Sequence, residues 1–139
     1  MMQALLQSLI AAELPVLAAH DVTMWGYVVL GALEDQAVRT QNALAEAIGA
    51  DKTRIIGTLD RLQAAGLITR EPDPRDRRAR VLAITERGRA VREAVRARIQ
   101  SNENRLLARL SPADRAGLLN ALRTLSELPR EEITGAGRP

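Results

Sequence analysis

The segment 66-GLITREPDPRDRRARVLAITERG-88 carries more information about the fold than any other part of the chain. Two apolar runs near its ends, 67–69 and 80–85, predict short β-strands, the second with Leu82 and Ile84 on one face. The stretch between them holds two prolines and two aspartates, which favour a turn, together with four arginines. The segment therefore predicts a β-hairpin with a long, arginine-rich loop.

Two short helices are predicted immediately before this hairpin. The first covers 40-TQNALAEAIG-49, with a threonine as its N-cap, and the second covers 52-KTRIIGTLDRLQAAG-66. The second has one apolar stripe, because Ile55, Leu59 and Leu62 recur at helical spacing. Two helices joined by a tight turn form a helix-turn-helix, and the hairpin after them is its wing. The predicted fold class is mainly α with a small β-hairpin wing, a winged helix-turn-helix.

Two more helices are predicted on the N-terminal side. The first covers about residues 2–19, where apolar residues recur at helical spacing. These residues are Leu6, Ile10, Leu14 and Leu17. Pro15 falls inside this helix and is expected to kink or divide it. Thr23 is a suitable N-cap for the second helix, 24-MWGYVVLGAL-33.

Two helices are also predicted on the C-terminal side. Thr85 is a suitable N-cap for a long helix over 86–110, and the polar segment 101-SNEN-104 is a candidate interruption of it. The motif 111-SPAD-114 predicts the start of a last helix that ends at Pro129. Residues 1–139 are interpreted as one domain, with a winged-helix lobe over about 23–99, flanking helices over 1–20 and 100–129, and a loose tail over 130–139.

Composition limits the class of protein. The chain has no cysteine, which excludes a disulfide framework and a thiolate zinc site. No apolar run approaches the roughly 20 residues of a membrane span, and the N-terminal segment lacks the features of a signal peptide. From these features we expect a cytoplasmic protein that does not cross a membrane.

The net charge of +3 is distributed unevenly along the chain. Residues 1–38 contain four acidic and no basic side chains, whereas residues 39–98 contain 14 basic and 8 acidic ones, a net charge of +6. A basic middle beside an acidic start is expected when one face of a protein meets a polyanion.

The residues needed for catalysis are missing from the sequence. His20 is the only histidine, and neither a cysteine nor an ordered cluster of acidic residues accompanies it. A metal site or a nucleophile–base pair therefore lacks parts, and there is no glycine-rich phosphate loop. The sequence predicts a protein that is not an enzyme and has no cofactor and no metal.

The order of the elements and two motifs resemble those of a known family. The segment 66–88 is similar to the wing pattern of the MarR family (multiple antibiotic resistance regulators) of bacterial winged-helix transcription factors. The segment 44-LAEAIGADKTRIIGTLDRLQAAG-66 resembles the helix pair that precedes that wing. The resemblance extends over about residues 5–128.

This resemblance implies a homodimer held together by the first and last helices, with a recognition helix in the major groove and a wing in the minor groove of double-stranded DNA. It also implies a palindromic operator and a repressor that a small, often aromatic, effector releases from DNA. The residues alone leave open whether the protein represses or activates. They also leave an alternative, a winged-helix module that binds an acidic protein partner and no DNA.

Candidate DNA contacts follow from this implied arrangement. Arg54 is suited to a bidentate contact with guanine, and Ile56 to contact with a thymine methyl group. Asp76 and Arg78 match the Asp-x-Arg of the family wing, and we expect the Asp76 carboxylate to hold the Arg78 guanidinium for entry into the minor groove. The candidates for phosphate contact are Thr40, Gln41, Asn42, Arg70, Arg75 and Arg77, and those on the recognition helix are Lys52, Thr53, Arg54, Ile56 and Gly57.

Candidate effector contacts lie near the second predicted helix. Trp25 and Tyr27 are the only aromatic residues of the chain, and His20 comes shortly before them. We expect these three side chains to be available for a small aromatic effector. The alternative interpretation is that they belong to the core.

Overall fold

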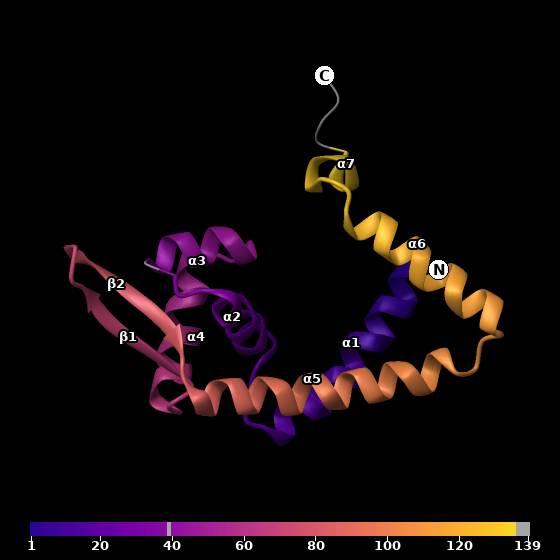
Figure 1. Cartoon of the computed structure of the whole chain (residues 1–139), viewed down its shortest axis with the longest axis horizontal. Helices are drawn as coiled ribbons and strands as arrows, with labels where there is room; N and C mark the ends of the chain where they lie inside the picture. Colours follow the sequence, from indigo (N-terminus) through magenta and orange to yellow (C-terminus); the bar gives the residue numbers. More distant parts are fainter. Residues whose placement is uncertain (39, 136–139) are drawn as a thin grey trace. The chain divides into compact units, whose positions relative to one another are not determined.

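The computed structural model describes residues 1–38 and 40–135, which form seven helices and two strands (Figure 1). The elements are α1 (Met2–Ala19), α2 (Met24–Asp35), α3 (Gln41–Ile48), α4 (Lys52–Ala64), β1 (Ile68–Asp73), β2 (Asp76–Ile84), α5 (Glu86–Leu107), α6 (Pro112–Ser126) and α7 (Arg130–Thr134). The predicted class, mainly α with a two-stranded antiparallel hairpin, is confirmed. The chain divides into two compact units, Met1–Ile99 and Gln100–Pro139.

One hydrophobic core holds the first unit together. Leu30 of α2, Leu59 of α4 and Leu82 of β2 are fully buried in it, and burying such a side chain contributes roughly 1.5–3 kcal/mol. The end of α1 adds Val16 and Leu17 to the same core. The last turn of the first helix therefore packs into the core of the lobe that was expected over about 23–99.

α1 runs without a break through Pro15, which does not divide it. Several of its large apolar side chains are exposed: Met2, Leu5, Leu6, Ile10 and Leu14. By length and composition alone α1 is long and apolar enough to cross a membrane, with a mean hydropathy of 1.4 over its 18 residues. The expectation that no apolar run approaches this length was wrong, because alanine and leucine fill the helix and Glu13 is its one charged residue.

Strand pairing extends the hairpin well beyond the two predicted strands. β1 and β2 pair from Ile68 opposite Ile84 to Asp73 opposite Asp76, and two residues remain for the turn. The predicted long loop is therefore wrong. Pairing overrides the low strand propensity of the prolines and charged residues in this stretch.

A bulge interrupts the pairing near the tip of the hairpin. Pro72 lies opposite Arg80, whereas the next pair joins Asp73 to Asp76, so residues 77–79 of β2 have no residue opposite them. Proline has no N–H to donate to a strand ladder, which accounts for a break at this point. Bulges redirect side chains, and this one contains two of the arginines.

A short backbone pairing attaches the segment before α3 to the hairpin. The Val38 N–H donates to the Leu82 carbonyl oxygen at 3.1 Å, and the Leu82 N–H donates to the Val38 carbonyl oxygen at 2.8 Å. No pattern around Val38 predicted this contact, because pairing between segments far apart in the chain leaves no local signal. It fixes the entry to α3 beside β2.

Thr85 and Gly88 join the hairpin to α5. The Thr85 Oγ1 accepts a hydrogen bond from the Gly88 N–H at 3.0 Å and donates one to the Gly66 carbonyl oxygen at 2.7 Å. The predicted N-cap is thereby confirmed. A Cβ atom on Gly88 would lie 2.1 Å from the Leu67 carbonyl oxygen, so this close approach requires glycine.

The C-terminal helices differ from the prediction in two places. α5 continues through residues 101–104 to Leu107, so the polar segment does not interrupt it. The Ser111 Oγ accepts a hydrogen bond from the Asp114 N–H at 3.1 Å, which confirms the start of α6. The first half of the expected loose tail instead forms α7, and residues 136–139 of that tail lie outside the described residues.

Candidate nucleic-acid interface

The start of α4 presents a row of exposed side chains. Its N-cap is Asp51, whose carboxylate accepts a hydrogen bond from the Thr53 N–H at 2.9 Å. The predicted apolar stripe is buried, and the positions predicted to face outward are exposed, which confirms the orientation of the helix. The exposed positions are Lys52, Thr53, Arg54, Ile56 and Gly57.

Arg54 of this row lies over an aromatic ring of another helix. Its guanidinium carbon is 5.9 Å from the centre of the Trp25 ring on α2. A guanidinium over a tryptophan face is attracted by about 0.5–1 kcal/mol at an exposed site. The contact ties the Arg54 side chain to α2 and restricts its directions.

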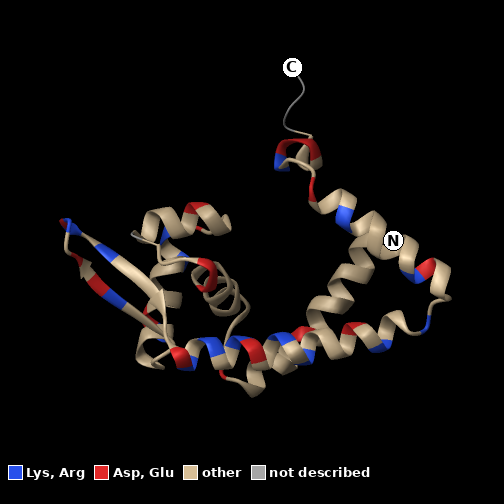
Figure 2. Cartoon of the chain, viewed as in Figure 1, with Lys and Arg blue, Asp and Glu red and all other residues tan. Residues whose placement is uncertain are grey.

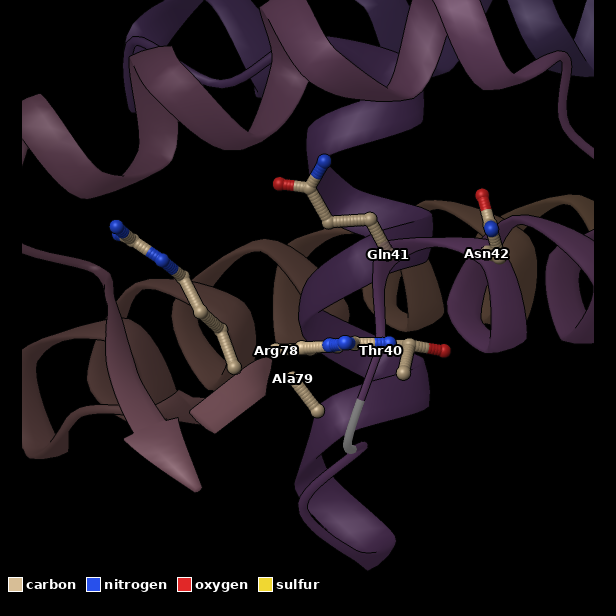
Figure 3. Close-up of a pocket in the computed structure, with 6 residues that line it drawn as sticks. Thr40, Gln41, Asn42, Arg78 and Ala79 are labelled. Carbon is tan, nitrogen blue, oxygen red and sulfur yellow. The ribbon is translucent and has the colours of Figure 1, made fainter. Parts of the chain in front are cut away.

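A hollow of about 380 Å³ lies between the N-terminus of α3 and strand β2 (Figure 3). It is lined by Thr40, Gln41, Asn42, Arg78, Ala79 and Arg80. The Thr40 Oγ1 caps the helix by accepting a hydrogen bond from the Ala43 N–H at 2.9 Å. The first N–H groups of a helix have no partner within it and carry partial positive charge. Together with the two arginines they make the hollow favourable for an anion.

Two features of the fold bring these residues together. The Val38–Leu82 pairing holds the start of α3 beside β2. The bulge inserts the unpaired residues 77–79 into β2 at the same place. Arg80 was not among the predicted DNA contacts and was assigned to the first position of the predicted strand 80–85. Its place two residues after Arg78, in the same arginine-rich stretch, is the signal that could have identified it.

Arg75 and Arg77 are exposed at the tip and in the bulge of the wing, and Figure 2 shows the basic residues along the hairpin and α5. The Asp73 and Asp76 carboxylates accept hydrogen bonds from the backbone N–H groups of Arg75 and Arg78, at 2.9 and 3.0 Å. Each bond closes a small local turn of the kind that aspartate favours. The turns fix the backbone from which Arg75 and Arg78 project.

The expected ion pair between the Asp76 carboxylate and the Arg78 guanidinium was wrong. Within residues 1–38 and 40–135, no ion pair joins these two groups, and the carboxylate binds the Arg78 backbone instead. The reason is the bulge, which leaves the Arg78 N–H with no residue opposite it. A backbone N–H needs a partner, and the carboxylate two residues earlier supplies one.

Arg70 points into the protein, unlike the arginines of the wing tip. Its side chain is 15% exposed. The Nε donates to the Gln63 Oε1 at 2.6 Å, and the two terminal nitrogens donate to the Asp60 Oδ1 at 2.5 Å and the Gln41 Oε1 at 3.2 Å. These partners come from α4 and α3, so one guanidinium joins β1 to both helices.

The three candidate effector residues each have a partner within the chain. His20 follows α1, with its Nδ1 2.9 Å from the Val16 carbonyl oxygen. Trp25 faces Arg54, and Tyr27 is half-buried against the hydrophobic core. The three residues lie at the end of α1 and in the first turn of α2, so they belong to one region of the first unit.

Two ion pairs involve α5. Arg92 donates to Glu34, a pair that attaches α5 to α2. Arg96 donates two hydrogen bonds of 3.0 Å to Glu93, and these bonds lower the pKa of the Glu93 carboxyl and raise that of Arg96. Among the described residues, no group of three or more His, Cys, Asp and Glu side chains could hold a metal ion.

Comparison with known proteins gives a consistent result. The MarR family model matches residues 20–79. The HTH-type transcriptional repressor NicR of Pseudomonas putida is 31% identical to this chain over 105 residues. That match covers 76% of this chain and 66% of NicR, so the chain spans slightly less than two thirds of the length of that relative.

Solved structures of similar fold cover nearly the whole chain. The transcriptional repressor CouR, solved on a 23-mer DNA duplex, has a TM-score of 0.74 at 26% identity and covers 91% of this chain and 89% of its own. BpsR of Bordetella bronchiseptica, whose DNA binding is regulated by 6-hydroxynicotinic acid, has a TM-score of 0.66 at 26% identity. It covers 93% of this chain and 95% of its own.

Proposed function

The chain belongs to the MarR family, and on that premise we propose that it is a dimeric, sequence-specific DNA-binding regulator of transcription. The observation that carries this proposal is the hollow between α3 and β2. It combines the N-terminus of a helix with Arg78 and Arg80, and the same unit carries a row of exposed residues on α4. A DNA phosphate is the anion that this arrangement suits.

The proposed contacts divide between the backbone and the bases of DNA. The start of α4 enters the major groove, where Arg54 binds a guanine edge and Ile56 contacts a thymine methyl group. The hairpin reaches the adjacent minor groove with Arg78, since a narrow minor groove attracts guanidinium groups. The phosphates are held by Thr40, Gln41, Asn42, Lys52, Thr53, Arg75, Arg77 and Arg80.

A second copy of the chain is the proposed partner of its exposed apolar helices. α6 has no buried residue, and its exposed leucines are Leu118, Leu119, Leu122 and Leu125. Exposed apolar faces of this extent mark interaction sites, and a two-fold copy is the commonest partner. We propose that α1 and α6 form the dimer interface, so that two α4 helices meet half-sites about 10 base pairs apart.

We further propose that the protein is a cytoplasmic repressor that a small aromatic molecule releases from DNA. CouR is a transcriptional repressor, and the DNA binding of BpsR responds to 6-hydroxynicotinic acid. In this chain the proposed contacts of the effector are His20, Trp25 and Tyr27. Since Trp25 also faces Arg54, a molecule that stacks on its ring would compete with the guanidinium.

Selection of duplexes from a random-sequence library by the purified protein tests the proposed function. We expect enrichment of an inverted repeat, together with a sedimentation mass of twice 15.2 kDa. Leu122→Glu on α6 should give a monomer, because it puts a charge into the proposed interface. If selection enriched no sequence, sequence-specific DNA binding would be contradicted. A wild-type monomer at micromolar concentration would contradict the dimer.

A further inference from the structure

We infer that Arg70 is a positioning residue that fixes the wing to both helices of the helix-turn-helix, an inference that rests on the proposed DNA binding. The alternative role is direct contact with a phosphate. Against that role, three nitrogens of the guanidinium already donate to Gln63, Asp60 and Gln41. A phosphate would have to displace these partners, and the Arg70 side chain is only 15% exposed.

The three hydrogen bonds use the specific shape of arginine. The guanidinium is planar and its N–H groups point in fixed directions, so it can bind acceptors on several elements at once. The Asp60 side chain is 58% exposed, and an ion pair in such a setting contributes little to stability. The importance of Arg70 therefore lies in the geometry that it imposes on its three partners.

That geometry connects the two parts of the protein proposed to contact DNA at the same time. Asp60 and Gln63 belong to α4, which carries the candidate base contacts, whereas Arg70 belongs to β1 of the wing. A recognition site works only when its groups are held within about 0.5 Å of the productive arrangement. Without Arg70, the wing and α4 would keep their shared core but would lose the polar contacts that fix the wing at the surface of α4.

The hydrogen bond from Arg70 to Gln41 also links Arg70 to the hollow, because Gln41 is one of its lining residues. Gln41 lines the hollow at the start of α3, and its Oε1 accepts a hydrogen bond from Arg70. Because the amide oxygen is occupied, the amide nitrogen is the end of the side chain that donates to a phosphate. Arg70 thus orients a phosphate contact without making one.

Substitution by lysine separates the charge of Arg70 from its geometry. Arg70→Lys keeps the positive charge but cannot hold three acceptors on two helices. We expect Arg70→Lys and Arg70→Ala both to weaken binding to a duplex selected by the wild-type protein by at least about tenfold. Neither should change the salt dependence of binding to a random duplex. Normal binding by Arg70→Lys, or an Arg70→Ala salt slope that is smaller by about 0.9, would assign Arg70 to a phosphate and overturn the inference.

A second substitution, at Asp60, leaves Arg70 in place. For this variant an electrostatic role and a positioning role predict opposite changes in DNA affinity. Asp60→Ala removes a negative charge, so a purely electrostatic effect would tighten DNA binding, whereas loss of positioning weakens it on the selected duplex. The matched control is Glu71→Ala, which removes an exposed acidic side chain next to Arg70 in β1 and should not weaken binding. Equal tightening by both variants would overturn the inference.

The same measurements distinguish this inference from the proposed function. If the wild-type protein bound neither duplex, the proposed function would fail, and with it the premise for Arg70. If the wild-type protein bound the selected duplex and both Arg70 variants and Asp60→Ala bound it equally well, only the positioning role would fail. Thermal unfolding of each variant identifies those folded at the assay temperature, and Asp60→Ala decides the question if the Arg70 variants unfold.

Discussion

The Arg54 guanidinium of α4 lies over the Trp25 ring of α2, with 5.9 Å between the guanidinium carbon and the ring centre. Trp25 is the one tryptophan of the chain. The pair joins a residue proposed to bind DNA bases with a residue proposed to contact the effector. It is therefore a direct physical connection between the two proposed activities of the protein.

The energy of this pair is measurable with a double-mutant cycle. We expect the cycle of Trp25→Ala and Arg54→Ala to give a coupling energy of about 0.5–1 kcal/mol, the value of an exposed cation–π contact. The measurement is urea unfolding at one fixed protein concentration, because the stability of a dimer depends on concentration. The control cycle pairs Trp25→Ala with Lys52→Ala, which should be additive within about 0.3–0.5 kcal/mol. Equal coupling energies in the two cycles would contradict a specific contact between Arg54 and Trp25.

Arg78 is the arginine on which the wing proposal depends most. Arg78→Ala should weaken binding to the selected duplex by at least about tenfold, or about 1.4 kcal/mol. The reason is that the proposed minor-groove contact loses its guanidinium, while the dimer remains folded. Titration of labelled duplex at moderate salt measures the loss, and Arg61→Ala, which removes the same charge from the last turn of α4, should cause a smaller one. Unchanged affinity of Arg78→Ala would contradict the wing proposal.

Asp76 should act through its oxygen atom and not through its charge. Asp76→Asn retains an acceptor for the Arg78 N–H, so we expect affinity for the selected duplex to stay within about twofold of wild type or to rise, since a negative charge leaves the DNA face. Asp76→Ala should have a lower affinity than Asp76→Asn, because the local turn loses its acceptor. If both variants lost affinity equally, the carboxylate charge would be the important property.

Gly88 should tolerate substitution less well than Gly57. Its Cβ would lie 2.1 Å from the Leu67 carbonyl oxygen, whereas at Gly57 nothing lies within 4 Å. Gly88→Ala should therefore destabilise the fold by about 1–3 kcal/mol or more. Gly57→Ala should stabilise it by up to about 1 kcal/mol, because alanine is the better helix former. Urea unfolding of the two variants gives both values, and loss of stability at Gly57 alone would contradict this reasoning.

Local signals in the sequence predicted the helix boundaries well. Thr23, Thr40 and Thr85 were each expected to cap a helix, and each accepts a backbone hydrogen bond at that place. Capping acts over three residues, so the residues that decide it are next to one another in the sequence. The orientation of α4 followed in the same way from its apolar stripe.

The contacts that organise the candidate interface could not be predicted in this way. The Val38–Leu82 pairing, the Arg70–Gln41 hydrogen bond and the Arg54–Trp25 contact all join residues far apart in the chain. The extent of the hairpin was also missed, because a stretch rich in proline, aspartate and arginine has low strand propensity and is a strand only through its partner. The spacing of residues in the sequence predicts which face of a helix or strand they occupy. Tertiary packing determines which other residues they contact.

The dependence of DNA binding on salt tests the central claim most directly. If the α3–β2 hollow, α4 and the wing meet phosphates, affinity for a random duplex should fall linearly in a log–log plot, with a slope of about −0.9 for each phosphate contacted. With six or more contacts this amounts to a loss of at least about 1,000-fold between roughly 50 and 200 mM salt. A wild-type protein that binds no duplex at about 50 mM salt, or binds with no salt dependence, would contradict the account and favour a protein partner.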